Sequence, residues 1–221
     1  MTPTGAVRDT LYVRRSLLLL LFGALAAAQT GHQHHPPHDT QEYARVLEDP
    51  QRDVWQLPHD VIMALDLKRR EAVADIGAGT GYFARRFARH AAKVYAVDID
   101  AKLLEIVKKN SPANVETVLA SADDPKLPQA SVDTIFFCDV LHHIKNRPAY
   151  YRKLAKALKP GGRIVDIDFH KNKPTPFGPP EAMRISEDDA IRELEAAGFR
   201  KTKSFEILPY QYFLVFQLQR P

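Results

Sequence analysis

Three glycines at alternate positions give this 221-residue chain its strongest chemical signal: Gly77, Gly79 and Gly81. They follow a short apolar segment, Ala72–Ile76, and precede a helical pattern. Because glycine has no Cβ, such a run lets the backbone turn sharply and lie close against a ligand. The free N–H groups at the start of the following helix can donate hydrogen bonds to a carboxylate or phosphate of that ligand.

An acidic residue stands on each side of the glycine run. Asp75 lies two positions before Gly77, and Asp98 ends the next apolar segment, 17 residues after Gly81. A carboxylate there can accept hydrogen bonds from both hydroxyls of a ribose. Dehydrogenases use the same device, but their G-x-G-x-x-G fingerprint requires glycine at the position of Tyr82. The pattern therefore predicts a nucleoside site and disfavours a dehydrogenase.

The spacing G-x-G-x-G, with an acidic residue two positions upstream, resembles the first motif of class I S-adenosylmethionine-dependent methyltransferases. Segments similar to later motifs of that family follow in the family's order, at residues 97–100, 122–128, 139–144 and 158–163. The resemblance covers residues 60–220. Within that family, the sequence is most similar to the small-molecule-type methyltransferases. In that group it is most similar to exported bacterial members whose substrate is unassigned.

The resemblance implies S-adenosylmethionine as the methyl donor and a role for each matching residue. Asp75 would orient the loop and the methionine ammonium, Asp98 would hold the ribose, and Ile99 would lie on the adenine face. Asp123 and Asp124 would read the adenine edge. Capping of a helix or turn is the alternative role for Asp75 and Asp139. The implied donor-binding residues are Asp75, Gly77, Ala78, Gly79, Gly81, Asp98, Ile99, Asp123, Asp124 and Asp139.

Four further residues are candidates for catalysis. Methyl transfer to a neutral nucleophile requires loss of a proton, and histidine is the natural base near neutral pH. His142 and His143 follow the predicted fourth strand, and Asp168 and His170 end the fifth. The alternatives are packing or a helix start for the paired histidines, a salt bridge for Asp168, and simple exposure for His170.

Strand and helix patterns alternate from residue 71 onward, which predicts an α/β fold with a mostly parallel sheet. Two last strands without a helix between them predict an antiparallel hairpin. With the resemblance, this gives a Rossmann-like, doubly wound, seven-stranded sheet. The predicted strands are 72–76, 93–97, 115–119, 132–137, 163–169, 200–207 and 211–218, and the predicted helices are 82–90, 101–109, 148–158 and 187–197.

The N-terminus has the pattern of a secretory signal peptide over residues 1–28. Three arginines precede an uncharged run over residues 16–30, which contains alanines 26–28. This run is shorter than the roughly 20 residues that a membrane-spanning helix needs. We therefore expect export to the periplasm or outside the cell, with cleavage near Ala28 and no stable membrane span afterwards. An uncleaved N-terminal membrane anchor is the alternative.

A His- and Pro-rich linker over residues 29–40 and a helical cap over residues 41–70 precede the predicted methyltransferase domain, residues 71–221. Four of the nine histidines fall in the linker, which is typical of a solvated tract or of weak metal binding. In the cap, Tyr43 and Trp55 are candidate walls of an acceptor pocket, and plain core packing is the alternative for Trp55.

Composition narrows the classes of function. The apolar fraction of 45% and charged fraction of 26% are those of a globular domain. The net charge of +4, which falls to +2 without residues 1–28, is too small to indicate nucleic-acid binding. The single cysteine, Cys138, excludes an intramolecular disulfide, and its place after two phenylalanines predicts a buried small apolar residue. We expect a small-molecule acceptor and no metal in the domain. Two alternatives remain: a non-catalytic S-adenosylmethionine-binding module and an exported metal-handling protein.

Overall fold

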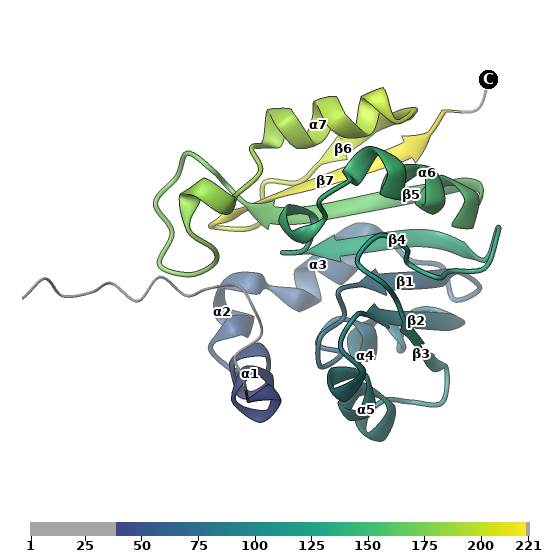
Figure 1. Cartoon of the computed structure of the whole chain (residues 1–221), viewed down its shortest axis with the longest axis vertical. Coiled ribbons are helices and arrows are strands. Elements are labelled where there is room, and N and C mark those ends of the chain that lie inside the picture. The colour runs from purple at the N-terminus through teal and green to yellow at the C-terminus, as the bar shows by residue number, and fades with distance from the viewer. Residues whose placement is uncertain (1–38, 220–221) are drawn as a thin grey trace, which may run out of the picture. The chain divides into compact units, whose positions relative to one another are not determined.

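The computed structural model of the protein describes residues 39–219. The predicted signal peptide, residues 1–28, and nearly all of the predicted linker, residues 29–40, lie outside this range. The described part of the chain folds as one seven-stranded sheet with helices on both faces (Figure 1). None of the helices within residues 39–219 has the length and apolar character needed to cross a membrane.

The sheet has the predicted architecture. Its strand order is β3-β2-β1-β4-β5-β7-β6, with β1 to β5 parallel and β7 antiparallel to both β5 and β6. Strand order reverses on either side of β1, and the carboxyl ends of strands at such a switch point form the usual ligand crevice. The strands are β1 (Ala72–Ile76), β2 (Lys93–Asp98), β3 (Val115–Leu119), β4 (Val132–Cys138), β5 (Leu158–Phe169), β6 (Phe199–Ser204) and β7 (Gln211–Leu218).

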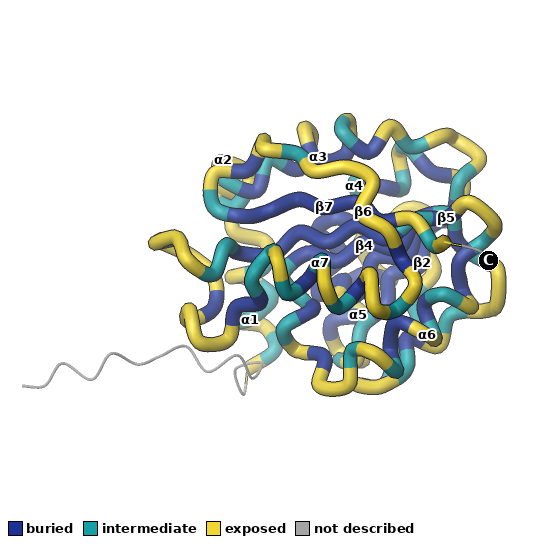
Figure 2. Tube along the Cα trace, turned by 90° about the horizontal axis from the view of Figure 1, so that it is seen from above, coloured by how far each residue is buried: buried dark blue, intermediate teal, exposed yellow. Residues whose placement is uncertain are grey.

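Two apolar layers cover the sheet. Helices α6 (Arg147–Ala157) and α7 (Glu187–Ala196) pack on one face, and α3 (Pro58–Leu65), α4 (Ala84–Phe87) and α5 (Ala101–Asn110) pack on the other. Figure 2 shows the central strands buried between them. The remaining helices are α1 (Thr40–Leu47) and α2 (Arg52–Gln56), which lie within the predicted cap, and the short 3-10 helices η1 (Leu141–His143) and η2 (Glu181–Met183).

Local sequence signals set the helix ends. The Ser186 hydroxyl accepts the Asp189 N–H at 3.1 Å and so caps the amino end of α7. At the other end of this helix, Gly198 has a φ of +90°, a conformation that glycine adopts without strain. The Asp100 carboxylate likewise caps α5 by accepting the Lys102 N–H at 2.8 Å.

Three predicted elements differ from the structure by more than one residue at an end. The helix over residues 82–90 is reduced to α4, with turns over residues 81–83 before it and 88–90 after it. β5 begins at Leu158, five residues early, with an irregular register opposite Val132 and Thr134. β6 ends at Ser204 rather than at residue 207, although the Phe205 amide still donates to Phe213 at 2.9 Å.

Candidate functional site

The glycine loop joins β1 to α4 at the switch point of the sheet. All three glycines have positive φ: +69° at Gly77, +56° at Gly79 and +87° at Gly81. The Val97 carbonyl on β2 accepts the Gly77 N–H at 2.8 Å, so the loop is tied to the neighbouring strand. A Cβ on Gly77 would lie 2.4 Å from Cγ2 of Val140, which leaves no room for a larger residue.

Asp98, at the carboxyl end of β2, holds the loop through backbone amides. Its Oδ2 accepts the Gly79 N–H at 2.8 Å, and its Oδ1 accepts the Asp100 N–H at 2.9 Å. Burial raises the pKa of Asp98, and these amides offset part of the rise. Each oxygen keeps acceptor capacity for a hydroxyl. Ile99, the next residue, is 65% exposed and offers an apolar surface to a flat ring. This pair therefore fits a ribose and an adjoining base.

Two other predicted carboxylates, one buried and one partly buried, lie where ionisation is disfavoured. Asp75 is 3% exposed, and its Oδ2 has no hydrogen-bond partner among residues 39–219. Burial raises the pKa of Asp75 to about 7. Burial and the charge of Asp168 raise the pKa of Asp139 to about 7 as well, although Asp139 accepts the Gln211 side-chain N–H at 2.7 Å. An unpartnered buried carboxylate is the kind of group that a cationic ligand satisfies.

The structure pairs Asp123 and Asp124 with a lysine. Nζ of Lys153 on α6 lies 3.1 Å from Oδ2 of Asp124 and 4.0 Å from Oδ2 of Asp123. The Ser121 hydroxyl bond and the Lys153 charge lower the pKa of Asp123, and the Lys126 amide and Lys153 lower that of Asp124. The negative charges of Asp124 and Asp98 both raise the pKa of the buried Tyr150 hydroxyl, so both carboxylates lie within reach of that hydroxyl.

The N-terminal cap lies directly on the glycine loop. A Cβ on Gly79 would lie 2.9 Å from Cδ1 of Leu47, which ends α1. Both carboxylate oxygens of Glu48 lie 2.7 Å from Nη2 of Arg85 on α4, and the Thr80 hydroxyl donates to the same carboxylate. Burial and the negative charge of Asp98 raise the pKa of Tyr43 on α1, so this predicted wall residue lies within reach of the Asp98 charge.

A second ion pair fastens α2 to α4. Oδ1 and Oδ2 of Asp53 lie 3.0 and 3.1 Å from Nη2 of Arg86, and the Tyr82 hydroxyl also donates to Asp53. The Tyr82 ring lies between the guanidinium groups of Arg52 and Arg86, at 4.1 and 4.0 Å from its centroid. We call the pairs Glu48–Arg85 and Asp53–Arg86 the cap latch. Sequence patterns do not reveal it, because its partners lie in separate elements.

A buried chain of amides ties the same cap to the other end of the domain. Nε2 of Gln56 on α2 donates to Oε1 of Gln211 on β7 at 2.7 Å. Nε2 of Gln211 in turn donates to Asp139. Arg52 approaches Oε1 of Gln56 at 3.4 Å. Sequence analysis missed both glutamines, which carry no motif of their own.

Of the four catalytic candidates, the structure brings two into direct contact. Nδ1 of His142 in η1 lies 3.0 Å from Oδ2 of Asp168 on β5. His143 is exposed, with its ring centroid 4.1 Å from that of His142. His170 is half-buried and faces Lys173 at 3.3 Å, and burial together with that lysine lowers its pKa.

Two remaining predictions concern Cys138 and Trp55. Cys138 is buried, which raises the pKa of its thiol well above the ordinary value and confirms a packing position. Trp55 stacks on Phe177 with ring centroids 5.2 Å apart and contacts Phe169 at 5.6 Å. Within residues 39–219 no three histidine, cysteine or acidic side chains converge as a metal site requires. His32 to His38 lie outside that range.

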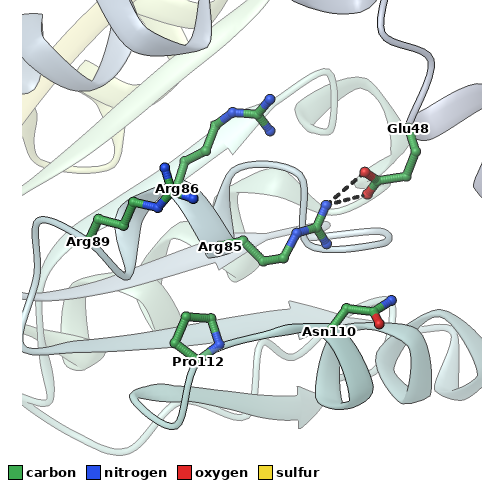
Figure 3. Close-up of a pocket in the computed structure, with 6 residues that line it drawn as sticks. All are labelled: Glu48, Arg85, Arg86, Arg89, Asn110 and Pro112. Atoms are coloured by element: carbon green, nitrogen blue, oxygen red, sulfur yellow. Dashed lines mark hydrogen bonds and ion pairs between the residues drawn. The ribbon is translucent and has the colours of Figure 1, made fainter.

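A cleft of about 390 Å³ opens beside α4, and none of the predicted donor residues lines it. Figure 3 shows Arg85 extending across it toward Glu48. The lining residues are Glu48, Arg85, Arg86, Arg89, Asn110 and Pro112. Because two of its three arginines already pair with carboxylates of the cap, the cleft belongs to the cap latch.

The known proteins that this chain resembles are methyltransferases. Residues 74–166 match the family model of a methyltransferase domain. The chain is 36% identical over 101 residues to demethylmenaquinone methyltransferase of Tropheryma whipplei, which is 45% of this chain and 42% of that protein. It is 30% identical over 152 residues to a protein of Mycobacterium tuberculosis named a probable S-adenosylmethionine-dependent methyltransferase, 66% of this chain and 55% of that one.

Solved structures resemble the fold over most of the described range. A crystal structure of an S-adenosylmethionine-dependent methyltransferase from Aquifex aeolicus matches with a TM-score of 0.75 and 25% identity. The match covers 82% of this chain and 99% of that one. By contrast, the chain spans between 19% and 55% of the length of the first curated relatives that it matches.

Proposed function

We propose that this chain, which carries a class I S-adenosylmethionine-dependent methyltransferase domain, catalyses methyl transfer from S-adenosylmethionine to a small-molecule acceptor. The observation that supports this proposal most is the pair of hydrogen bonds that fixes Asp98 beside the glycine loop. One carboxylate oxygen accepts a hydrogen bond from the Gly79 amide, and the other accepts one from the Asp100 amide. The bonds fix the carboxylate at the carboxyl end of β2, where a ribose would present its hydroxyls.

The bound donor supplies a methyl group on a positively charged sulfonium, which is an effective leaving group. The chain has little covalent chemistry to perform and acts by position and electrostatics. Asp98 would hold the ribose, with Ile99 against the adenine. Asp75 and Asp139 would lie along the methionine portion, as the resemblance implies.

The charges of the site favour a cationic ligand. Asp75 and Asp139 are both kept from easy ionisation by burial, and each pKa is raised to about 7. Arg52 is the positive neighbour that opposes both shifts. A sulfonium and an ammonium brought into this region would stabilise the ionised carboxylates and lower both pKa values. Binding should therefore release protons near pH 7.

Calorimetry with S-adenosylhomocysteine tests the donor site without any acceptor. We expect binding to the wild-type protein, weakened by about 1–3 kcal/mol in Asp98→Ala because charge-assisted hydrogen bonds are lost. Asp60→Asn, on the exposed surface of α3, is the matched control. Unchanged affinity in a folded Asp98→Ala protein would remove the ribose role. Absence of binding to the wild-type protein at millimolar ligand would remove the proposed function.

We also propose that the protein is exported, with the signal peptide over residues 1–28 cleaved near Ala28. The support is the sequence pattern alone: a basic start, a short apolar run and an alanine-rich site. Mass spectrometry of the protein purified from its source measures the mature N-terminus. A chain that begins at residue 1 or 2 would contradict cleavage and favour the membrane-anchor alternative.

A further inference from the structure

Four side chains form a hydrogen-bonded chain through the interior, from the N-terminal cap to Asp139. Nη2 of Arg52 on α2 lies 3.4 Å from Oε1 of Gln56. Nε2 of Gln56 donates to Oε1 of Gln211 on β7 at 2.7 Å, and Nε2 of Gln211 donates to Oδ1 of Asp139 at 2.7 Å. Gln56 and Gln211 are 0% and 2% exposed. Because burying an amide without partners is costly, these contacts are needed to keep both glutamines inside.

Every donor in this chain points toward Asp139. A guanidinium group only donates and an ionised carboxylate only accepts, whereas an amide does both. The two ends therefore fix which atom of each glutamine side chain is nitrogen and which is oxygen. Hydrogen bonds in series polarise one another inside a protein. The positive charge of Arg52 at one end thus favours the ionised form of Asp139 at the other.

The backbone also holds Asp139 in an unusual position. Its φ is +60°, in the left-handed region that few residues with a side chain adopt, and such conformations cluster at functional sites. The Asp139 N–H donates to the Ile167 carbonyl at 2.9 Å. Gln211 holds Oδ1, while Oδ2 lies 3.8 Å from the Cys138 thiol, which is a weak donor. One oxygen is thus fixed, and the other keeps acceptor capacity for a cation.

The charge of Asp139 is finely balanced near neutral pH. Burial and the negative charge of Asp168 on β5 raise its pKa to about 7. The charge of Arg52, the hydrogen bond from Gln211 and the charge of His142 in η1 oppose this rise. The remaining titratable groups that face Asp139 are Asp166 on β5, Cys138 on β4 and Tyr43 on α1. Loss of a single favourable contact should therefore change how much of Asp139 is ionised.

We propose that Gln211 and Gln56 are positioning residues of the donor site, which fix Asp139 in the orientation and charge that favour S-adenosylmethionine over S-adenosylhomocysteine. This inference rests on the proposed function and concerns the same site. The two ligands share their nucleoside and amino-acid parts, and they differ by the methyl group and the positive charge on sulfur. A fixed carboxylate in the site attracts the charged donor more than the neutral thioether product. The hydrogen-bonded chain thereby sets how well the site distinguishes the two.

Calorimetry measures the ratio of the two dissociation constants without any acceptor. We expect Gln211→Met, which keeps the side-chain length and removes the amide, to lower the preference for S-adenosylmethionine about five- to tenfold at pH 7. Gln56→Met acts one link further away and should lower the preference about two- to threefold. Gln217→Met on β7 and Gln51→Met before α2 are the matched controls, because both side chains are exposed. They should leave the preference unchanged.

A double variant separates positioning from plain structural support. If Gln211 acts through Asp139, Gln211→Met should lower the preference no further once Asp139→Asn has removed the charge. A further loss of preference in the double variant would show that the glutamine acts on another group. Equal weakening of both ligands by Gln211→Met would indicate structural support alone. Either result would overturn the proposal.

The pH dependence of the preference is a second readout. In the wild-type protein the preference should rise with pH as Asp139 ionises near pH 7. Gln211→Met should move this rise to higher pH, because the carboxyl loses a hydrogen bond that stabilises its ionised form, while Asp168, His142 and Arg52 remain. The same ligands are used with both proteins, so a difference between the two profiles reports on the protein. Coincident profiles would contradict the proposed role.

Gln56→Met decides the question if Gln211→Met does not fold. A folded Gln56→Met protein with the wild-type preference and the wild-type pH profile would overturn the proposal. A wild-type protein that binds both ligands equally well would overturn it too, and would leave the donor site in place. Failure of the wild-type protein to bind S-adenosylhomocysteine at millimolar concentration would instead refute the proposed function itself.

Discussion

Asp98 and Asp168 end two parallel strands of one sheet, yet their surroundings differ in kind. Asp98 has each oxygen on a backbone amide, from Gly79 and Asp100. Asp168 has one oxygen on the Phe169 amide and the other on an imidazole. Amides hold a charge in place and cannot take up a proton, whereas an imidazole can. Under the proposed function, we call the region of Asp98 the donor side and the region of Asp168 the acceptor side, and of these two carboxylates only Asp168 contacts a group that can take up a proton.

Gly79→Val should weaken donor binding more than any other substitution proposed for the donor side. The residue has a φ of +56°, and its Cβ would lie 2.9 Å from Cδ1 of Leu47. We expect S-adenosylhomocysteine affinity to fall by about 100-fold or more, that is by at least about 2.7 kcal/mol. Gly161→Val is the matched control, since Gly161 has a φ of +78° and a Cβ there would meet no neighbouring atom within 4 Å. Equal losses in both variants would attribute the effect to backbone strain.

Asp139→Asn should sharpen the comparison by removing a charge that repels Asp168. Burial and Asp168 raise the pKa of Asp139 to about 7 in the folded protein, against about 3.9 in the unfolded chain. The folded protein therefore binds more protons between these values, so this carboxyl makes stability fall as pH rises from about 4 to about 7. The variant should be more stable at pH 7 in urea unfolding, by at most about 4 kcal/mol.

The control for that measurement is Asp60→Asn, an exposed residue on α3. It should leave the pH dependence of the free energy of unfolding as it is in the wild-type protein. If the free energy of unfolding of Asp139→Asn depends on pH as that of the wild-type protein does, the Asp139 carboxyl ionises normally in the folded protein.

Reversing the charge of one residue of the Glu48–Arg85 pair should weaken S-adenosylhomocysteine binding less than Gly79→Val does. Glu48 and Arg85 are 39% and 23% exposed, so their pair contributes about 1 kcal/mol. We expect Glu48→Arg or Arg85→Glu alone to speed the release of S-adenosylhomocysteine about fivefold. The double reversal should restore the wild-type rate in stopped-flow displacement. Release that is equally fast in the single and double variants would show that the pair does not hold the cap.

Asp124→Ala should have the smallest effect. Its carboxylate already faces Lys153 at 3.1 Å and accepts the Lys126 N–H at 2.8 Å. Loss of a half-exposed carboxylate with such partners should weaken S-adenosylhomocysteine binding by about 0.5 kcal/mol. A loss as large as that expected for Asp98→Ala would place the adenine on Asp124 and extend the donor side to β3.

Most of the sheet could be predicted from sequence because its strands are apolar runs bounded by turn residues. The predicted strands over residues 72–76 and 115–119 are β1 and β3 without change. The glycine spacing and Asp98 were likewise readable, since motif residues lie close together along the chain. Residues 82–90 were harder, because a helical pattern does not show that turns replace both ends of the predicted helix.

The contacts between distant elements could not be predicted. His142 and Asp168 were separate candidates because their residue types suggested chemistry, but 26 positions separate them. Asp53 and Arg86 are 33 positions apart, and Glu48 and Arg85 are 37 apart. Periodicity assigns a residue to a face of its own element. It does not say which side chain of another strand or helix lies opposite.

The amide chain from Gln56 through Gln211 to Asp139 joins residues 155 positions apart inside the fold. Each link has a fixed direction, because an amide group donates through nitrogen and accepts through oxygen. A shortened chain beginning at Pro58 would leave the Gln211 carbonyl without its donor. A buried acceptor deprived of its partner costs about 1–3 kcal/mol. The first helices and the final strand thus behave as one cooperative unit, and trimming either end would loosen both.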